Sequence, residues 1–183
     1  MFAQNKDYDR LIKIENLNVI TSSDFSTLRS LELKVQEEIS SYLRRRFNVV
    51  ELFKGFELYI ATKIYTVNSL ISYPDIDGNL YSVLTETLAG ETPVTNPEKF
   101  TLNDTRNQQL LSLFIDVVLY HAHARINARN TPDFRITRYR EAIEWLVGVN
   151  EDTVYPDFPI LLKEPITGLG IDYGQTGINE NTY

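Results

Sequence analysis

Apolar side chains recur at helical spacing in the first part of the chain. After Ser22-Ser23-Asp24, residues of the types that commonly cap helices, apolar positions repeat in steps of three and four residues. These positions are Leu28, Leu31, Val35, Ile39, Tyr42 and Leu43. The spacing predicts an amphipathic helix that ends near Phe47. The charged residues expected to face water on it are Arg29, Glu32, Glu37 and Glu38.

Two further helices are predicted later in the chain. From about Asp104 to Arg129, apolar side chains fall on nearly every side, which predicts a helix at the centre of a bundle or against a neighbouring subunit. The run 130–133 then signals a new helix, with Thr131 as the cap and Pro132 in the first helical position. Gly148 is expected to end this third helix. Its buried stripe is Ile136, Tyr139, Ile143, Leu146 and Val147.

Residues 55–103, between the first two helices, have a different character. They are rich in Tyr, Ile, Val and Thr, and Asp77-Gly78 followed by Asn79 is a hairpin turn signature. We therefore expect a β-hairpin insertion. The opening stretch 56–65 also fits a helical stripe, so a helix is an alternative there.

Neither end of the chain shows a sustained period. Residues 1–21 are mixed and polar, which indicates an extended arm with a short apolar patch at Leu17, Val19 and Ile20. Residues 150–183 contain several prolines and glycines and cannot bury enough apolar surface alone.

The predicted fold is mainly α, and α+β overall. We expect a single domain over 1–183, since 183 residues are long enough for one substantial core. A three-helix core over about 22–54 and 104–149 carries the β-rich insertion over about 55–103. An extended C-terminal arm follows over 150–183.

Charge and composition exclude several classes of protein. The chain holds 18 basic and 25 acidic residues, with a formal charge of −7 and no cysteine. Disulfide scaffolds, thiolate metal sites and cysteine catalysis are therefore excluded. Residues 55–103 carry two basic and six acidic groups, and residues 150–183 carry one and six. An acidic chain is a poor candidate for an autonomous nucleic-acid binder, because phosphate binding needs clustered Lys and Arg.

The first twenty residues carry charges throughout and do not form a signal peptide. The most apolar stretch, 110–122, contains Asp116 and is too short to span a bilayer. We therefore expect a soluble protein that is made in a reducing cytoplasm and has no membrane partner.

His121 and His123 are the most obvious candidates for chemistry. A spacing of two residues places them about 200° apart on a helix, whereas zinc-binding pairs on helices are three or four residues apart. We interpret both as packing or surface histidines, and we expect no metal, cofactor or catalytic residue. Asp75 and Asp77 resemble the start of a calcium loop. Leu80, however, occupies the position where that loop needs glycine, so a solvated turn is expected.

Glu37 and Glu38 lie close in sequence to the basic run Arg44-Arg45-Arg46. We interpret them as the solvated face of the first helix, since isolated surface ion pairs contribute little. The alternative is that these groups form salt bridges between subunits or contact a phosphate backbone. Tyr and Phe together number twenty, many of them in the insertion and the tail, which points to a protein interface.

Three stretches of the chain resemble a known family. They are EEISSYLRRRFNV (37–49), QQLLSLFIDVVLYHAHAR (108–125) and RITRYREAIEWLVGV (135–149). In this order they resemble the head-tail connector, or adaptor and head-completion, family of tailed phages, including its Mu-like branch. Members commonly have a short link between the first two helices. This chain differs in its long insertion between those helices and in its long C-terminal arm.

The resemblance implies a structural virion protein, assembled in the host cytoplasm, that joins the portal vertex to the tail. It implies a ring of copies, commonly about twelve, in which each subunit offers one face to its neighbour's other face. The partners would be the portal protein, a tail or second adaptor protein, and DNA that passes without sequence readout. The candidate subunit or DNA-channel contacts are Glu37, Glu38, Arg44, Arg45, Arg46, Arg125 and Arg129.

The alternative function is that of a non-catalytic DNA-transaction accessory protein. In that case Arg44, Arg45 and Arg46 would bind phosphates, together with Arg125 and Arg129.

Overall fold

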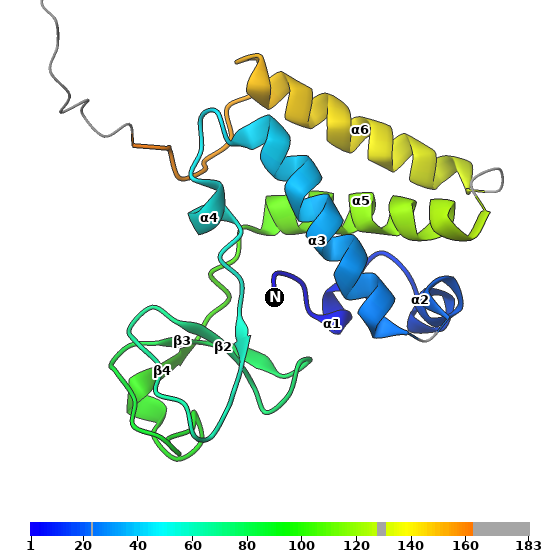
Figure 1. Cartoon of the computed structure of the whole chain (residues 1–183). Helices are drawn as coiled ribbons and strands as arrows, with labels where there is room; N and C mark the ends of the chain where they lie inside the picture. Colours follow the sequence, from blue (N-terminus) through cyan, green and yellow to red (C-terminus); the bar gives the residue numbers. More distant parts are fainter. Residues whose placement is uncertain (23, 128–130, 163–183) are drawn as a thin grey trace, which may run out of the picture.

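The computed structural model describes residues 1–22, 24–127 and 131–162. Within these residues the chain is a mixed α+β fold with six α-helices and a four-stranded sheet. The helices form one part of the molecule and the sheet forms the other (Figure 1). The three long helices are α3 (Phe25–Leu43), α5 (Gln108–Asn127) and α6 (Asp133–Asn150). The short helices are α1 (Asn5–Tyr8), α2 (Ile14–Thr21) and α4 (Val49–Leu52).

The three predicted helices are confirmed and pack against one another. Helices α5 and α6 lie side by side in opposite directions, and α3 crosses both (Figure 1). As the sequence predicted, α5 is central. The burial of each of its large apolar side chains contributes about 1.5–3 kcal/mol to the stability of the fold. These buried residues are Leu110, Leu111, Phe114, Ile115, Val117, Val118 and Leu119. In the part of the chain that the structure describes, no helix is both long and apolar enough to cross a membrane.

The helix ends differ in part from the prediction. Asp24 caps α3 as expected, since its side chain accepts a hydrogen bond from the Ser26 amide at 2.9 Å. At α6, Pro132 and not Thr131 occupies the cap position. Gly148 does not end α6, because the backbone continues in a helix to Asn150 and the chain then folds back, with the Thr153 amide donating to the Gly148 carbonyl at 2.9 Å.

The insertion is a mixed sheet in the order β1-β2-β3-β4, and it is larger than a hairpin. Strand β1 is parallel to β2, and the other two pairs are antiparallel. The strands are β1 (Glu57–Leu58), β2 (Leu70–Tyr73), β3 (Asn79–Val83) and β4 (Phe100–Leu102), the last of them preceded by the 3-10 turn η1 (Pro97–Lys99). The predicted hairpin is β2–β3. The alternative helix over 56–65 is wrong.

The hairpin turn requires glycine at Gly78. A Cβ atom there would lie 2.2 Å from the carbonyl oxygen of Tyr73, closer than any side chain permits. The turn also contacts the start of the chain, because the Asp77 carboxylate accepts a hydrogen bond from the Lys6 amide at 3.0 Å.

The N-terminal residues do not form the predicted arm. Phe2, Tyr8 and Leu17 are buried, and the Phe2 ring packs edge-on against Phe53 and Phe114 at centroid distances of 5.1 and 5.3 Å. The apolar residues are divided between two short helices, α1 and α2, so they show no continuous period. This segment is therefore part of the helical core.

The expectation that Arg29 and Glu32 face water is also wrong. Glu32 is buried and accepts a hydrogen bond from the Tyr8 hydroxyl at 2.7 Å. Arg29 pairs with Glu32 and donates to the Asn5 side chain at 2.7 Å. Both residues therefore hold the N-terminal segment against α3.

The first part of the predicted C-terminal arm packs on the helical core. Phe158 is buried between Phe47 and Trp145, at centroid distances of 5.5 and 5.9 Å. The backbone of residues 159–161 is bonded to the loop after α3, and Phe47 forms a bridge with Ile160, which explains why α3 ends before Phe47. Residues 163–183 lie outside the described residues.

Replacing Phe2 by alanine tests the burial of the N-terminal segment. We expect Phe2→Ala to lower the free energy of unfolding by about 3–5 kcal/mol, because it leaves a cavity among Phe53 and Phe114. The exposed Val19→Ala is the control, and it should change stability by less than about 0.5 kcal/mol. Urea unfolding measures both, and equal effects would favour the arm that the sequence predicted.

Candidate functional site

The residues proposed from the sequence as subunit or DNA contacts do not form one surface. Glu37, Arg44 and Arg45 are exposed near the end of α3, where Glu37 and Arg44 approach to 3.4 Å. Arg125 is exposed in the last turn of α5, at the other end of the helical core. Arg129 lies outside the described residues. The separation of these groups follows from the length of α5 and α6, about 30 Å for a 20-residue helix.

Arg46 has a structural partner inside the chain. Its Nη1 donates to the Val149 carbonyl at 2.7 Å and forms an ion pair with Asp152. The side chain is half-buried and fastens the end of α6 to the loop after α3. Of the basic run, Arg44 and Arg45 are therefore the two most exposed residues.

Glu38 lies between the three long helices, so its predicted place on the solvated face is wrong. His121 Nε2 of α5 donates to one carboxylate oxygen at 2.7 Å, and the Tyr139 hydroxyl of α6 donates to the other at 2.9 Å. Tyr120 stacks on the Tyr139 ring with a centroid distance of 4.0 Å. Glu38 thus bonds to both of the other long helices, and we call this group the Glu38 cluster.

The electrostatics of the Glu38 cluster favour an ionised carboxylate and a protonated phenol. The hydrogen bond from His121 holds the pKa of Glu38 below its ordinary value, and the bond from Tyr139 acts in the same direction. Burial raises the pKa of Tyr139 to about 12, and its hydrogen bond to Glu38 adds to the increase. Lys34 Nζ lies 3.4 Å from His121 Nδ1, on the solvent side.

His123 faces a different side of α5 from His121, as the spacing predicted. It lies beside Arg135, and burial lowers its pKa, with the positive charge of Arg135 acting in the same direction. Arg135 is buried, donates to the Leu11 carbonyl at 2.8 Å and stacks over the Phe134 ring at 4.7 Å. These residues line a groove at the α2 end of the helical core.

Arg106 is a buried charge at the boundary between the helices and the sheet. Its guanidinium donates to the Phe2 carbonyl at 2.8 Å, to Asp7 at 2.6 Å and to Asp104 at 2.8 and 2.9 Å. Burial opposes ionisation of Asp104, but hydrogen bonds and charge from Arg106 hold the pKa of this carboxyl below its ordinary value. All three guanidinium nitrogens have partners, so Arg106 joins segments of the chain and has little capacity left for a ligand.

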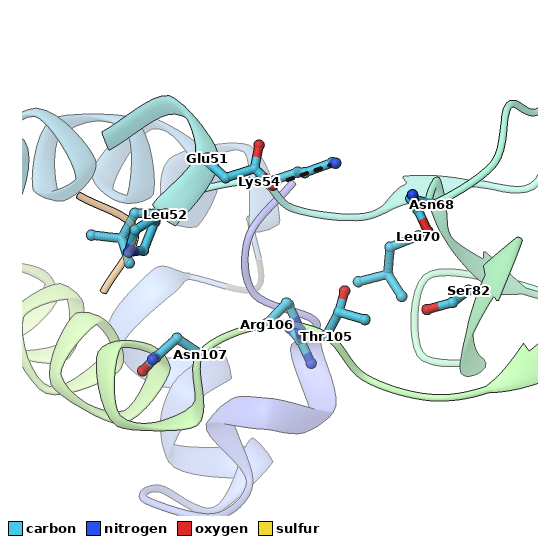
Figure 2. Close-up of a pocket in the computed structure, with 10 residues that line it drawn as sticks. Glu51, Leu52, Lys54, Asn68, Leu70, Ser82, Thr105, Arg106 and Asn107 are labelled. Atoms are coloured by element: carbon cyan, nitrogen blue, oxygen red, sulfur yellow. Dashed lines mark ion pairs between the residues drawn. The ribbon is translucent and has the colours of Figure 1, made fainter. Parts of the chain in front are cut away.

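A cleft of about 470 Å³ lies next to Arg106, between the helical core and the sheet. Figure 2 shows that its walls come from α4 and the loop after it, from the sheet, and from residues 105–107. The Ser82 hydroxyl in its wall is buried and has no hydrogen-bond partner among the described residues. The remaining lining residues are Glu51, Leu52, Lys54, Asn68, Leu70, Thr105, Asn107 and Pro159.

Sequence reasoning missed both Arg106 and Asp7. They are 99 residues apart, and neither belongs to a recognisable motif, so only the fold brings them together. The one available signal was a charged pair, Asp104 and Arg106, just before an apolar helix. Within residues 1–22, 24–127 and 131–162, no group of three or more His, Asp or Glu side chains is arranged to hold a metal ion.

Comparison of the chain with protein-family models, with curated proteins and with solved structures finds no match.

The Glu38 cluster predicts a pH-dependent contribution to stability. We expect Glu38→Gln to lower the free energy of unfolding at pH 7 by about 1.5 kcal/mol, because it weakens two charge-assisted hydrogen bonds. The pKa of Glu38 is lowered in the folded state, so its stabilising effect is present above the unfolded pKa and is lost as the pH falls through the folded pKa. The difference between the variant and the unaltered chain should therefore shrink on acidification.

Glu37→Gln is the matched control for this change, since it alters the neighbouring residue of the same helix. Its carboxylate is exposed, and among the described residues its ion-pair partner is Arg44 at 3.4 Å, so we expect an effect below about 0.5 kcal/mol. Thermal or urea unfolding at several pH values measures both variants. A Glu38→Gln effect that is equal to the control would contradict a stabilising role for the Glu38 cluster.

Arg106→Met should destabilise the chain by about 3–5 kcal/mol, because it leaves the buried Asp7 carboxylate without its counter-charge. Lys54→Met is the control, since Lys54 borders the same cleft and its ion pair with Glu51, at 3.6 Å, is exposed. Chemical unfolding should show the large loss for Arg106→Met alone. Similar stabilities for the two variants would contradict a stabilising role for the ion pair of Arg106 with Asp7.

Proposed function

We propose that this chain is a structural subunit of a ring that connects the portal vertex of a tailed-phage head to the tail. DNA passes through the ring without sequence readout, and the chain performs no catalysis. The partners are further copies of the chain, the portal protein and a tail or second adaptor protein.

The observation that carries this proposal is the mutual packing of the three stretches that resemble the connector family. Residues 37–49, 108–125 and 135–149 fall on α3, α5 and α6 or directly after them, and these helices pack together. One residue from each stretch contributes to the Glu38 cluster: Glu38, His121 and Tyr139. Stretches that resemble a family in order and spacing thus also form one helical unit, as a shared core would require.

Exposed apolar side chains support an assembly role. Isolated exposed apolar residues are ordinary, but here several belong to the insertion, to the C-terminal segment and to the α2 end of the core. On the insertion they are Leu58, Ile60, Ile64, Val67, Leu84, Leu88, Val94 and Leu102. A ring subunit needs at least two such surfaces, one for each neighbour, and further ones for the portal and tail.

The charge of the chain suits a DNA conduit better than a DNA-binding protein. The formal charge is −7, and the exposed pair Arg44 and Arg45 is separated from Arg125 by the length of the helical core. DNA would then move past the ring without being retained. The alternative function, an accessory protein that binds phosphates through Arg44–Arg46, requires measurable binding to duplex DNA.

Native mass, measured alone and with the portal protein from the same genome, tests the proposal. We expect a ring-sized species, or a stoichiometric complex with the portal, because both surfaces of each subunit would then be occupied. A chain that remains monomeric and does not bind the portal would contradict it. Salt-dependent, sub-micromolar binding to duplex DNA, lost on Arg44→Ala and Arg45→Ala, would favour the accessory function instead.

A further inference from the structure

An apolar groove lies at one end of the helical core, between α2 and the start of α6. Its cavity measures about 500 Å³. Val19 is 73% exposed and Phe134 is 58% exposed, so large apolar side chains face water here. We call it the α2–α6 groove, and its apolar lining residues are Leu11, Ile12, Val19, Ile20, Pro132 and Phe134.

The walls of the α2–α6 groove are held in place by Arg135. This buried side chain donates to the Leu11 carbonyl on one side and stacks over the Phe134 ring on the other. The groove is therefore formed by groups that are fixed to one another, and it does not depend on a single loose side chain.

A second apolar surface lies at the opposite end of the helical core. We call residues 155–162 the arm segment. Phe158 anchors it to the core, whereas Tyr155, Ile160 and Leu162 are exposed, Leu162 to 87%. The Asn48 amide donates to the Pro159 carbonyl at 2.8 Å, and the Leu161 amide donates to the Arg46 carbonyl at 2.9 Å. The backbone of the arm segment is thus fixed while its apolar side chains remain available.

The two surfaces carry opposite charge. Among the described residues, the groove is lined by the cation Lys13 and by no acidic residue, and the deeper cation Arg135 pairs with Asp116 at 3.6 Å. Residues 151–162 contain three acidic residues and no Lys or Arg. Asp152 is paired with Arg46, whereas Glu151 and Asp157 are exposed. The remaining sequence, 163–183, adds three acidic residues and one lysine. An apolar and acidic segment is the occupant that an apolar and basic groove favours.

The arm segment cannot occupy the groove of its own chain. Helix α6 begins at the groove and ends at the arm, and its 18 residues span about 27 Å. Residues 159–161 are bonded to the loop after α3 at the far end (Figure 1). The occupant must therefore come from a second copy, and the same contact can then repeat from copy to copy until the ring closes.

We propose that the arm segment of one copy docks in the α2–α6 groove of the next copy, as the head-to-tail contact that builds the ring. This inference rests on the proposed ring function and assigns its subunit interface. Leu162 and Ile160 pack against Val19 and Phe134, and the carboxylate of Asp157 lies near Lys13.

Two full-length variants, each defective at one surface, test the inference. Val19→Asp blocks the groove, and Leu162→Asp blocks the arm segment. Each should weaken self-association by about 100-fold or more, because a carboxylate would be buried against apolar side chains. Both residues are exposed, so thermal unfolding should be unchanged. Sedimentation and native mass spectrometry, with and without the portal protein, measure assembly.

Mixing the two variants gives the decisive result. The intact arm of Val19→Asp can dock in the intact groove of Leu162→Asp, whereas the two remaining surfaces are both blocked. We therefore expect a 1:1 heterodimer that cannot extend to a ring. Leu33→Asp is the matched control, since Leu33 is 68% exposed on α3 and belongs to neither surface, and it should assemble like the unaltered chain.

Several results would overturn the inference. Assembly of Val19→Asp or Leu162→Asp into full rings would leave the proposed function standing and exclude this interface. A mixture that stays monomeric would also exclude it. If Leu88→Asp weakened self-association and Leu162→Asp did not, the insertion and not the arm segment would occupy the groove. An unaltered chain that stays monomeric and does not bind the portal would contradict both the inference and the proposed function.

Discussion

Arg106 lies where the N-terminal segment, the end of the sheet and the start of α5 meet, and its guanidinium fixes the N-terminal segment to the residues that join the sheet to α5. Apolar burial is strong but non-directional, so it would leave the sheet several ways to rest on the core. The bonds to Asp7, Asp104 and the Phe2 carbonyl admit one arrangement, because donors and acceptors must meet at 2.6–2.9 Å. Removing the charge of Arg106 or of Asp7 would leave the other charge buried and unpaired, so a substitution at either residue is expected to be strongly destabilising.

Within the helical core, the hydrogen bonds of the Glu38 cluster likewise select one arrangement of the helices. Leu and Val side chains on α3, α5 and α6 would tolerate small shifts of one helix along another. A carboxylate that accepts from His121 at 2.7 Å and from Tyr139 at 2.9 Å fixes all three helices at once. Tyr120 stacks on the Tyr139 ring and adds apolar contact beside these bonds. Polar groups therefore set the geometry that apolar groups stabilise.

The elements that could be predicted from the sequence are those whose formation depends on residues within the element itself. The three long helices followed from apolar spacing, and the β2–β3 hairpin followed from Asp77-Gly78. The burial of Phe2 and the pairing of Arg106 with Asp7 could not be predicted, because their partners are far away in sequence and no local pattern marks them. Glu38 was misplaced for a related reason. A carboxylate on an amphipathic helix normally faces water, and only the crossing of α3 over α5 brings His121 to it.

Charge decides which surfaces of this chain can meet. Copies with a net charge of −7 repel one another on average, so association requires a local contact at which the signs are opposite. The net negative charge is concentrated in the insertion and the C-terminal region, whereas Lys13 lines the α2–α6 groove. Apolar side chains are exposed at both of these places, so attraction between opposite charges and burial of apolar surface act on the same pair of surfaces. Two surfaces of opposite charge at opposite ends of one rigid core favour head-to-tail association over a symmetric dimer, because either surface facing its own copy would bring like charges together.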